Sequence, residues 1–222
     1  FYISWRLFMK NLSKIKILII LTILILLYTL ISAISYSNAV SSNLSENIFR
    51  LHVIAASNSE EDQNLKYIVR DEILKYMNEL TKNATSKEDV IELVNKNLGT
   101  FKEISQSTIR KNGYNYNVNV SVCSSDFPTK SYGDISLPAG KYDSLKVEIG
   151  EASGQNWWCV LFPPLCFVDV SSGIVPDDSK EIMKENLSEE SYNIIAHDES
   201  EISFKFKILE IFQNVKTMIA NN

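Results

Sequence analysis

The stretch FRLHVIAASNSEEDQNLKYIVRDEILKYMNEL, residues 49–80, joins a strand pattern directly to a helix pattern. Its opening, FRLHVIA, is a short apolar run that fits a buried strand. The polar residues 57–62 then supply candidate helix caps, and the carboxylates at 60–62 oppose the positive end of a helix dipole. From Leu65 to Leu80 apolar residues recur every three or four positions, which predicts one long amphipathic helix.

The sequence then predicts a second helix followed by strands. Ser86 and Asp89 resemble a capping box, and the helix that they open ends before Gly113. Residues 114–122 alternate between apolar and polar side chains, which is typical of an antiparallel strand with one buried face. The turn-rich residues 126–142 are predicted to form a structured loop. Further strands are predicted at 145–149 and 157–162, and helices beyond 177, including 201–219.

These patterns predict an α+β fold in which one exported domain spans residues 45–222. We expect an antiparallel sheet, two long N-terminal helices and C-terminal helices, without a dividing linker. Residues 1–44 are predicted to be a cytoplasmic stub followed by a signal peptide or membrane anchor, because 17–34 carries no charge. The basic residues before this run keep its N-terminal end in the cytoplasm, so the domain is exported. Small residues at 37–39 leave cleavage after Ala39 open.

Composition and motifs exclude several classes of function. The net charge is -5 without a basic cluster, which argues against nucleic-acid binding. The sequence has no GxSxG, HExxH, CxxC or glycine-rich phosphate loop. Cys159 or Cys166 with His52 is the candidate for nucleophilic chemistry, and the alternative function is therefore an exported cysteine-dependent hydrolase acting on cell wall or peptide. No cofactor is predicted, and the cysteine spacing matches no familiar zinc pattern.

The segment NWWCVLFPPLCF, residues 156–167, is the most aromatic part of the chain. Trp157 and Trp158 are adjacent, so in a strand they face opposite sides. One can enter the core, while the other is either covered or presented to a partner, a frequent role of tryptophan. Cys159 and Cys166 have two interpretations that the sequence leaves open. They form a disulfide around the prolines, which export permits, or they are two small apolar side chains.

Arg50 and His52 are polar residues inside an apolar strand. We expect Arg50 to pair with a carboxylate, and Asp71 or Glu72 is nearest in the sequence. His52 is interpreted as a structural imidazole. Arg50, His52, Cys159 and Cys166 are therefore the candidate structural residues.

Three segments closely resemble the stage II sporulation protein R family of endospore-forming bacteria. They are RLHVIAASNSEEDQNLKYIVRDEIL (50–74), FPTKSYGDISLPAGKY (127–142) and NWWCVLFPPLCF (156–167). The resemblance extends over about residues 49–169. Ala56, Asn58 and Gln155 depart from the pattern, which has Asn, Asp and His at these positions.

The resemblance implies an exported signalling protein and not an enzyme. In this family the forespore exports the protein across its membrane into the space between forespore and mother cell. There the protein activates a membrane-embedded aspartic protease, stage II sporulation protein GA, which processes pro-sigma-E. The expected partners are therefore this protease and, unless the N-terminal helix is cleaved, the membrane.

We predict that the loop 127–142 and the aromatic segment lie close together and form the activating surface. The candidate contact residues are Phe127, Lys130, Tyr132, Asn156, Trp157 and Trp158.

Overall fold

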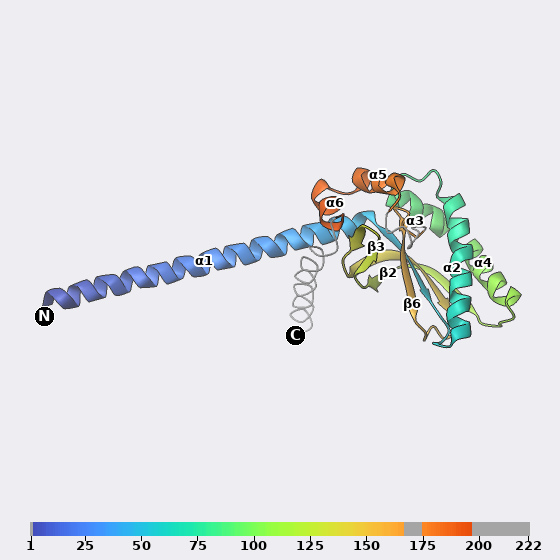
Figure 1. The fold of residues 1–222 in the computed structure, drawn as a ribbon, viewed down its shortest axis with the longest axis horizontal. Helices are drawn as coiled ribbons and strands as arrows, with labels where there is room; N and C mark the ends of the chain where they lie inside the picture. Colours follow the sequence, from blue (N-terminus) through green and yellow to red (C-terminus); the bar gives the residue numbers. More distant parts are fainter. Residues whose placement is uncertain (1, 167–174, 197–222) are drawn as a thin grey trace. The chain divides into compact units, whose positions relative to one another are not determined.

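The computed structural model describes residues 2–166 and 175–196 (Figure 1). The chain forms two compact units, Phe1–Val40 and Ser41–Asn222. The helix predicted at 201–219 lies outside the described residues.

Helix α1, Tyr2–Asn47, contains the whole apolar run 17–34. Its segment Lys14–Asn47 is long and apolar enough to cross a membrane, and none of its most apolar window is buried. The hydroxyls of Thr22 and Thr29 donate to carbonyl oxygens three residues earlier, at 2.8 and 2.9 Å. These hydroxyls are therefore satisfied within the helix, as a bilayer requires. The helix fits the signal or anchor expected from the sequence.

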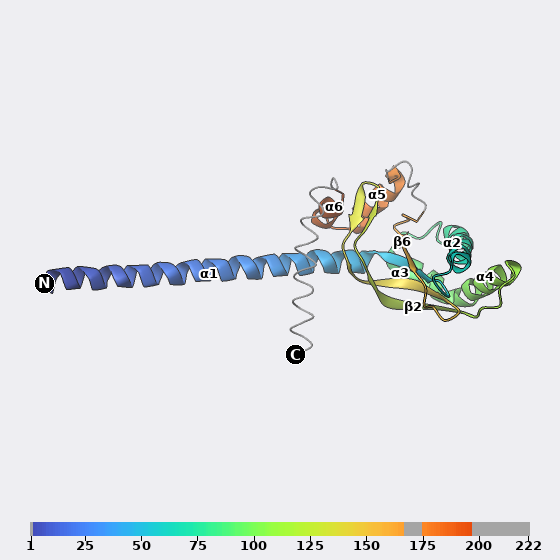
Figure 2. The same ribbon diagram turned by 60° about the horizontal axis from the view of Figure 1, so that its bottom comes forward.

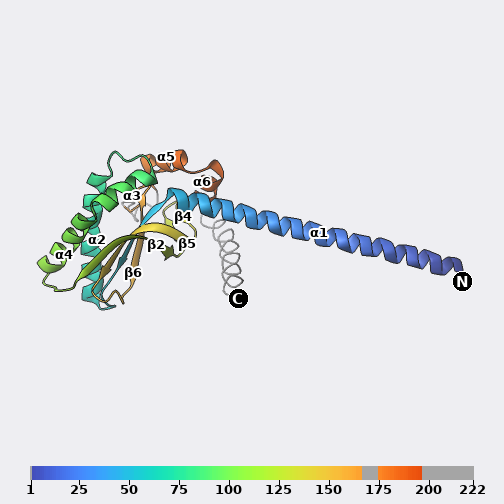
Figure 3. The ribbon, with the colours of Figure 1, turned by 180° about the vertical axis from the view of Figure 1, so that it is seen from behind.

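The second unit is built on a four-stranded sheet in the order β2-β5-β1-β6 (Figures 2 and 3). The strands are β1 Phe49–Ile54, β2 Val118–Phe127, β5 Gly140–Ile149 and β6 Asn156–Phe162. β1 pairs antiparallel with β6 and parallel with β5, whereas β2 and β5 are antiparallel. The α+β class is confirmed, but the sheet is not antiparallel throughout as expected, because β1 and β5 are parallel at its centre. Every residue of β1 is buried, as a central strand requires.

Three helices follow β1 in the chain. They are α2 Glu60–Leu80, α3 Lys87–Lys96 and α4 Leu98–Lys111. The capping box predicted at Ser86 and Asp89 is present at the start of α3. The second predicted helix is two helices, because Asn97 ends α3 and its side chain accepts a hydrogen bond from Tyr76 at 3.0 Å. α2 packs on α4, and α4 contacts β2.

The two faces of the sheet differ in what covers them. Trp157 contacts Tyr67 of α2, so its side of the sheet, which also carries Leu51 and Val53, is called the helix face. The opposite side, called the hairpin face, carries Arg50, His52 and Trp158. The hairpin β3 Lys130–Tyr132 and β4 Ile135–Leu137 reaches this face through Tyr132. Helices α5 Asp177–Asn186 and α6 Glu189–Ile195 follow, and α6 contacts β4.

The turn between β5 and β6 docks against the residues that follow β1. Gly154 donates its backbone N–H to the carbonyl of Ala55 at 3.0 Å, and the Ser153 hydroxyl donates to the carbonyl of Ala56 at 2.8 Å. A Cβ atom at Gly154 would lie 2.1 Å from the carbonyl oxygen of Ser57. The contact involves backbone on both sides, so it requires glycine at this position.

We predict that Gly154→Ala lowers the free energy of unfolding by about 2 kcal/mol or more, because the new methyl group must push two backbone segments apart. Gly99→Ala is the matched control, since a Cβ at this position in α4 meets nothing within 4 Å. We expect the control to be neutral or to gain up to about 1 kcal/mol from helix propensity. Denaturant unfolding of the full chain in detergent measures both. Equal stability of the two variants would contradict the docking of the turn.

Candidate functional site

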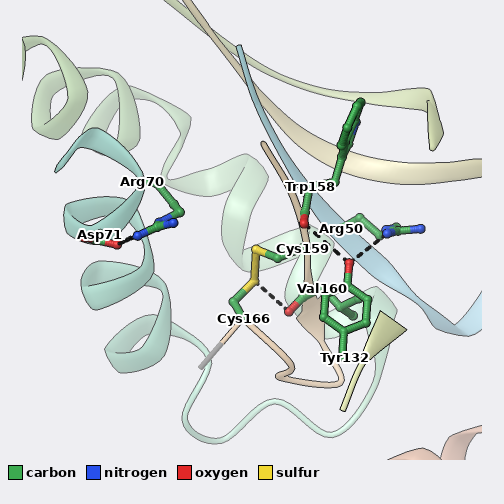
Figure 4. Close-up of a disulfide and its surroundings, with 8 residues drawn as sticks. All are labelled: Arg50, Arg70, Asp71, Tyr132, Trp158, Cys159, Val160 and Cys166. Carbon is green, nitrogen blue, oxygen red and sulfur yellow. Dashed lines mark hydrogen bonds and ion pairs between the residues drawn. A yellow bond between two sulfur atoms is a disulfide. The ribbon is translucent and has the colours of Figure 1, made fainter. Parts of the chain in front are cut away.

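Arg50 lies at the centre of an aromatic cluster on the hairpin face. Its side chain is fully buried, and Nη2 donates to the hydroxyl of Tyr132 at 2.9 Å (Figure 4). The guanidinium carbon lies 4.1 Å from the ring centroid of Phe127 and 5.0 Å from that of Tyr142. Burial raises the pKa of Tyr142 to about 12, and its hydroxyl donates to the carbonyl of Pro138 at 3.0 Å. Phe127, Tyr132 and Tyr142 are called the aromatic cage.

The predicted pairing of Arg50 with Asp71 or Glu72 is wrong. Alternate residues of β1 face opposite sides of the sheet, so Arg50 points away from α2, which carries both carboxylates. Asp71 instead pairs with Arg70 at 2.6 Å, and its side chain is 61% exposed. Among the described residues, no carboxylate forms an ion pair with Arg50.

His52 lies next to Arg50 on the hairpin face. Its Nε2 is 2.7 Å from Oδ1 of Asn156, and its ring stacks on Trp158 with centroids 6.0 Å apart. Burial lowers the pKa of His52, since the charged imidazolium would lose its hydration. With Nε2 donating to the amide oxygen, the neutral ring keeps Nδ1 as an acceptor. These contacts fit the structural imidazole that the sequence suggested.

A row of charged and polar groups on β5 and β2 continues the hairpin face. Lys146 and Glu148 form an ion pair at 2.6 Å, and the side-chain amide of Asn119 donates to Glu148 at 3.0 Å. These residues were not among the candidates predicted from the sequence. The signal was present, because Lys146 and Glu148 occupy the polar positions of an alternating strand and so share one face.

Trp157 and Trp158 face opposite sides of the sheet, as predicted. Trp157 lies on the helix face, with its ring centroid 5.5 Å from that of Tyr67 and 4.3 Å from the guanidinium carbon of Arg70. Trp158 stacks on His52 on the hairpin face. Both side chains are half-buried, so neither is simply a core residue.

The loop predicted at 126–142 is largely strand, because β2 continues to Phe127 and β5 begins at Gly140 around the β3–β4 hairpin. It lies beside the aromatic segment, as predicted: the hydroxyl of Tyr132 is 3.5 Å from the carbonyl of Trp158 (Figure 4). Phe127 and Tyr132 are only 3% and 9% exposed. A contact residue was expected to be exposed, which is wrong for Tyr132, whereas Lys130 is exposed.

The two cysteines of the aromatic segment form a disulfide, with Cα atoms 5.3 Å apart. The turn through the two prolines folds back on β6, and the carbonyl of Val160 accepts from the backbone N–H groups of Leu165 and Cys166 at 3.2 and 3.1 Å. The Cys166 sulfur also lies 2.9 Å from this carbonyl (Figure 4). Because a disulfide sulfur has no proton, this is a close contact and not a hydrogen bond.

The arrangement does not assemble the cysteine–histidine pair of the alternative function. Cys159 pairs with Leu51 across the strands and shares its face, whereas His52 points to the other face. Cys159 is also 2% exposed, and its sulfur is bonded to Cys166. A thiolate at Cys159 is therefore unavailable as a nucleophile or as a zinc ligand while the disulfide is intact.

We predict that Cys159→Ala/Cys166→Ala loses about 2.5 kcal/mol of stability, the loop-entropy value for so short a loop. The reducing agent dithiothreitol should destabilise the wild type by a similar amount. Cys123→Ala is the control, because Cys123 is the free cysteine of the domain. This variant should keep the full response to dithiothreitol, measured by denaturant unfolding. A double-alanine variant that still responds to dithiothreitol would contradict the assignment.

We also predict that His52 makes the domain less stable in mild acid. The folded-state pKa lies below the ordinary value of 6.5, so below that pH the unfolded chain binds more protons than the folded chain. Stability is therefore fully present above the ordinary value and is lost as the pH falls toward the folded value. His52→Gln should lose less stability than the wild type between about pH 7.5 and 5.5. If the free energy of unfolding fell equally for the two proteins over this pH range, His52 would not contribute to the loss of stability in acid.

Comparison with known proteins identifies the family to which this chain belongs. The family model described as stage II sporulation protein R matches residues 45–172, which include the whole sheet, the hairpin and the aromatic segment. Stage II sporulation protein R of Bacillus subtilis (strain 168) is 37% identical over 152 residues, which are 68% of this chain and 68% of that protein. No solved structure matches the chain. The chain belongs to the stage II sporulation protein R family.

Proposed function

We propose that this chain is an exported signal of sporulation that activates a membrane-embedded aspartic protease, stage II sporulation protein GA, which then processes pro-sigma-E. The protein acts in the space between forespore and mother cell after export across the forespore membrane. The observation that carries the proposal is the family match over residues 45–172, which covers both faces of the sheet. The apolar helix α1 supports export, because basic residues precede its charge-free run.

The partner is engaged by folded surface and not by covalent chemistry. Two cysteine–histidine combinations were considered from the sequence, Cys159 or Cys166 with His52. Cys159 lies on the opposite face of the sheet from His52, and both sulfurs are in the disulfide. The hairpin face carries charged, polar and aromatic side chains that can bind a partner protein. It has an exposed charge at Lys130 and half-buried polar and aromatic side chains at Asn156 and Trp158. Half-buried tryptophan is typical of residues that contribute strongly to protein interfaces.

The other candidate contact residues have different roles in this proposal. Phe127 and Tyr132 are buried around Arg50, so they hold the hairpin in place. The tip of the hairpin is held by Asp134, which accepts from the backbone N–H of Val175 at 2.9 Å and pairs with Lys180 at 2.5 Å. Trp157 contacts Tyr67 of α2, and the next residue of this helix, Ile68, is 40% exposed, so this region is the competing surface.

The test is to produce the chain, the protease and pro-sigma-E together in a non-sporulating host and to measure processing. We predict that Lys130→Ala reduces processing at least about tenfold, equivalent to about 1.4 kcal/mol of binding. Its free energy of unfolding should stay within about 0.5 kcal/mol of the wild type, because the side chain is exposed.

Lys102→Ala is the matched control, an exposed lysine on α4 that leaves the hairpin face unchanged. It should process normally. Loss of processing in Ile68→Ala, together with normal processing in Lys130→Ala, would move the contact to the helix face. No processing by the wild type would contradict the proposed function itself.

A further inference from the structure

Buried polar atoms without a partner gather on the hairpin face. In the part of the chain that the structure describes, such side-chain atoms are Nε and Nη1 of Arg50, Nδ1 of His52, and Nε1 of Trp157 and Trp158. All except the Trp157 nitrogen belong to residues that point to the hairpin face. Buried polar groups are normally paired, so a cluster of unpaired ones calls for an explanation.

Arg50 has more unpaired hydrogen-bond donors than any other residue of this cluster. An arginine side chain stays charged in proteins, and within the described residues the only hydrogen bond of Arg50 is the one from Nη2 to Tyr132. The N–H groups on Nε and Nη1 have no acceptor. The rings of Phe127 and Tyr142 attract the cation but accept no conventional hydrogen bond. The guanidinium thus has donors ready for an anion that the described residues do not supply.

We propose that Arg50 is a binding site for a carboxylate from another molecule, an Asp or Glu side chain of a partner protein. A guanidinium presents its N–H groups as a planar fork that a carboxylate accepts at two points. A single negative charge is enough, because Lys146 on the same face is already paired with Glu148. The aromatic cage removes water from the cation and so strengthens its attraction for an anion.

Tyr132 regulates access to this site. Its hydroxyl accepts the hydrogen bond from Nη2 of Arg50, and the hairpin that carries this tyrosine covers Arg50. A carboxylate that takes the guanidinium in a two-point contact competes with this hydroxyl. Binding therefore loosens the contact between the hairpin and β1 and couples the site to the exposed hairpin residue Lys130. The identity of the partner rests on the proposed function, whereas carboxylate binding by Arg50 does not.

Direct detection is possible because the chain has only four arginines, at positions 6, 50, 70 and 110. The full chain is labelled with [15N]arginine in detergent and titrated with sodium acetate, with sodium chloride at equal ionic strength as the reference. Arg50→Lys identifies the Arg50 signal. We expect the chemical shift of the Arg50 Nε–H proton to move downfield as acetate is added and then to reach a plateau. Arg70 is an internal control, because its Nε already donates to Asp71 at 2.8 Å, and its signal should stay in place.

Two variants separate this site from a purely structural role. Tyr132→Phe keeps the ring but removes the competing hydroxyl, so it should bind acetate at least threefold more tightly. Arg50→Met keeps the length of the side chain but removes its charge and its donors. In the processing assay, Arg50→Met should be folded and inactive.

The outcomes test the carboxylate site, its role in signalling and the proposed function separately. An Arg50 signal that does not respond to acetate in either wild type or Tyr132→Phe overturns the carboxylate site, whatever the processing assay shows. This test does not require Arg50→Met to fold, because it uses only the wild type and Tyr132→Phe. An acetate response together with normal processing by folded Arg50→Met leaves the site in place but removes it from signalling. An acetate response without processing by the wild type counts against the proposed function alone.

Discussion

The burial of one arginine in the central strand is the constraint on which the hairpin face depends. Removing a guanidinium from water costs several kcal/mol, and an ion pair normally offsets that cost. Arg50 has none among the described residues and instead contacts Phe127, Tyr132 and Tyr142. Each cation–π contact supplies about 0.5–2 kcal/mol. The end of β2, the hairpin and the start of β5 therefore have to meet over β1, because each contributes one ring to the cage.

The two faces of the same strands consequently have different properties. The helix face is closed by α2 and α4 and is further fixed by the disulfide, which ties the middle of β6 at Cys159 to the turn that follows the strand. Its polar contacts are mostly complete, as in the pairing of Arg70 with Asp71. The hairpin face has the unsatisfied donors, the stacked His52 and Trp158, and the exposed end of the hairpin. A signalling domain can use such a face for recognition while the other face supplies stability.

Much of the fold could be predicted from the sequence, because strand and helix periods are local. The alternation at 114–122 indicated a strand, although β2 begins only at Val118, and the stripe after Leu65 indicated helix α2. Partner strands are not encoded in a period of two, so the parallel pairing of β1 with β5 was not predictable in this way. The short strands of the hairpin were hidden by turn-rich composition. The disulfide was one of two open interpretations, since the sequence does not give the distance between two cysteines.

The error over Arg50 shows where reasoning from the sequence stops and what the structure adds. Proximity in the sequence favoured the carboxylates of α2, but Leu51 and Val53 are the residues of β1 that face this helix. Strand alternation alone then excludes Asp71 and Glu72 once the side of α2 is known. It leaves the cation on a face where the carboxylate of Glu148 is occupied by Lys146 and Asn119. The same geometry that excludes an internal partner for Arg50 thus favours an external one.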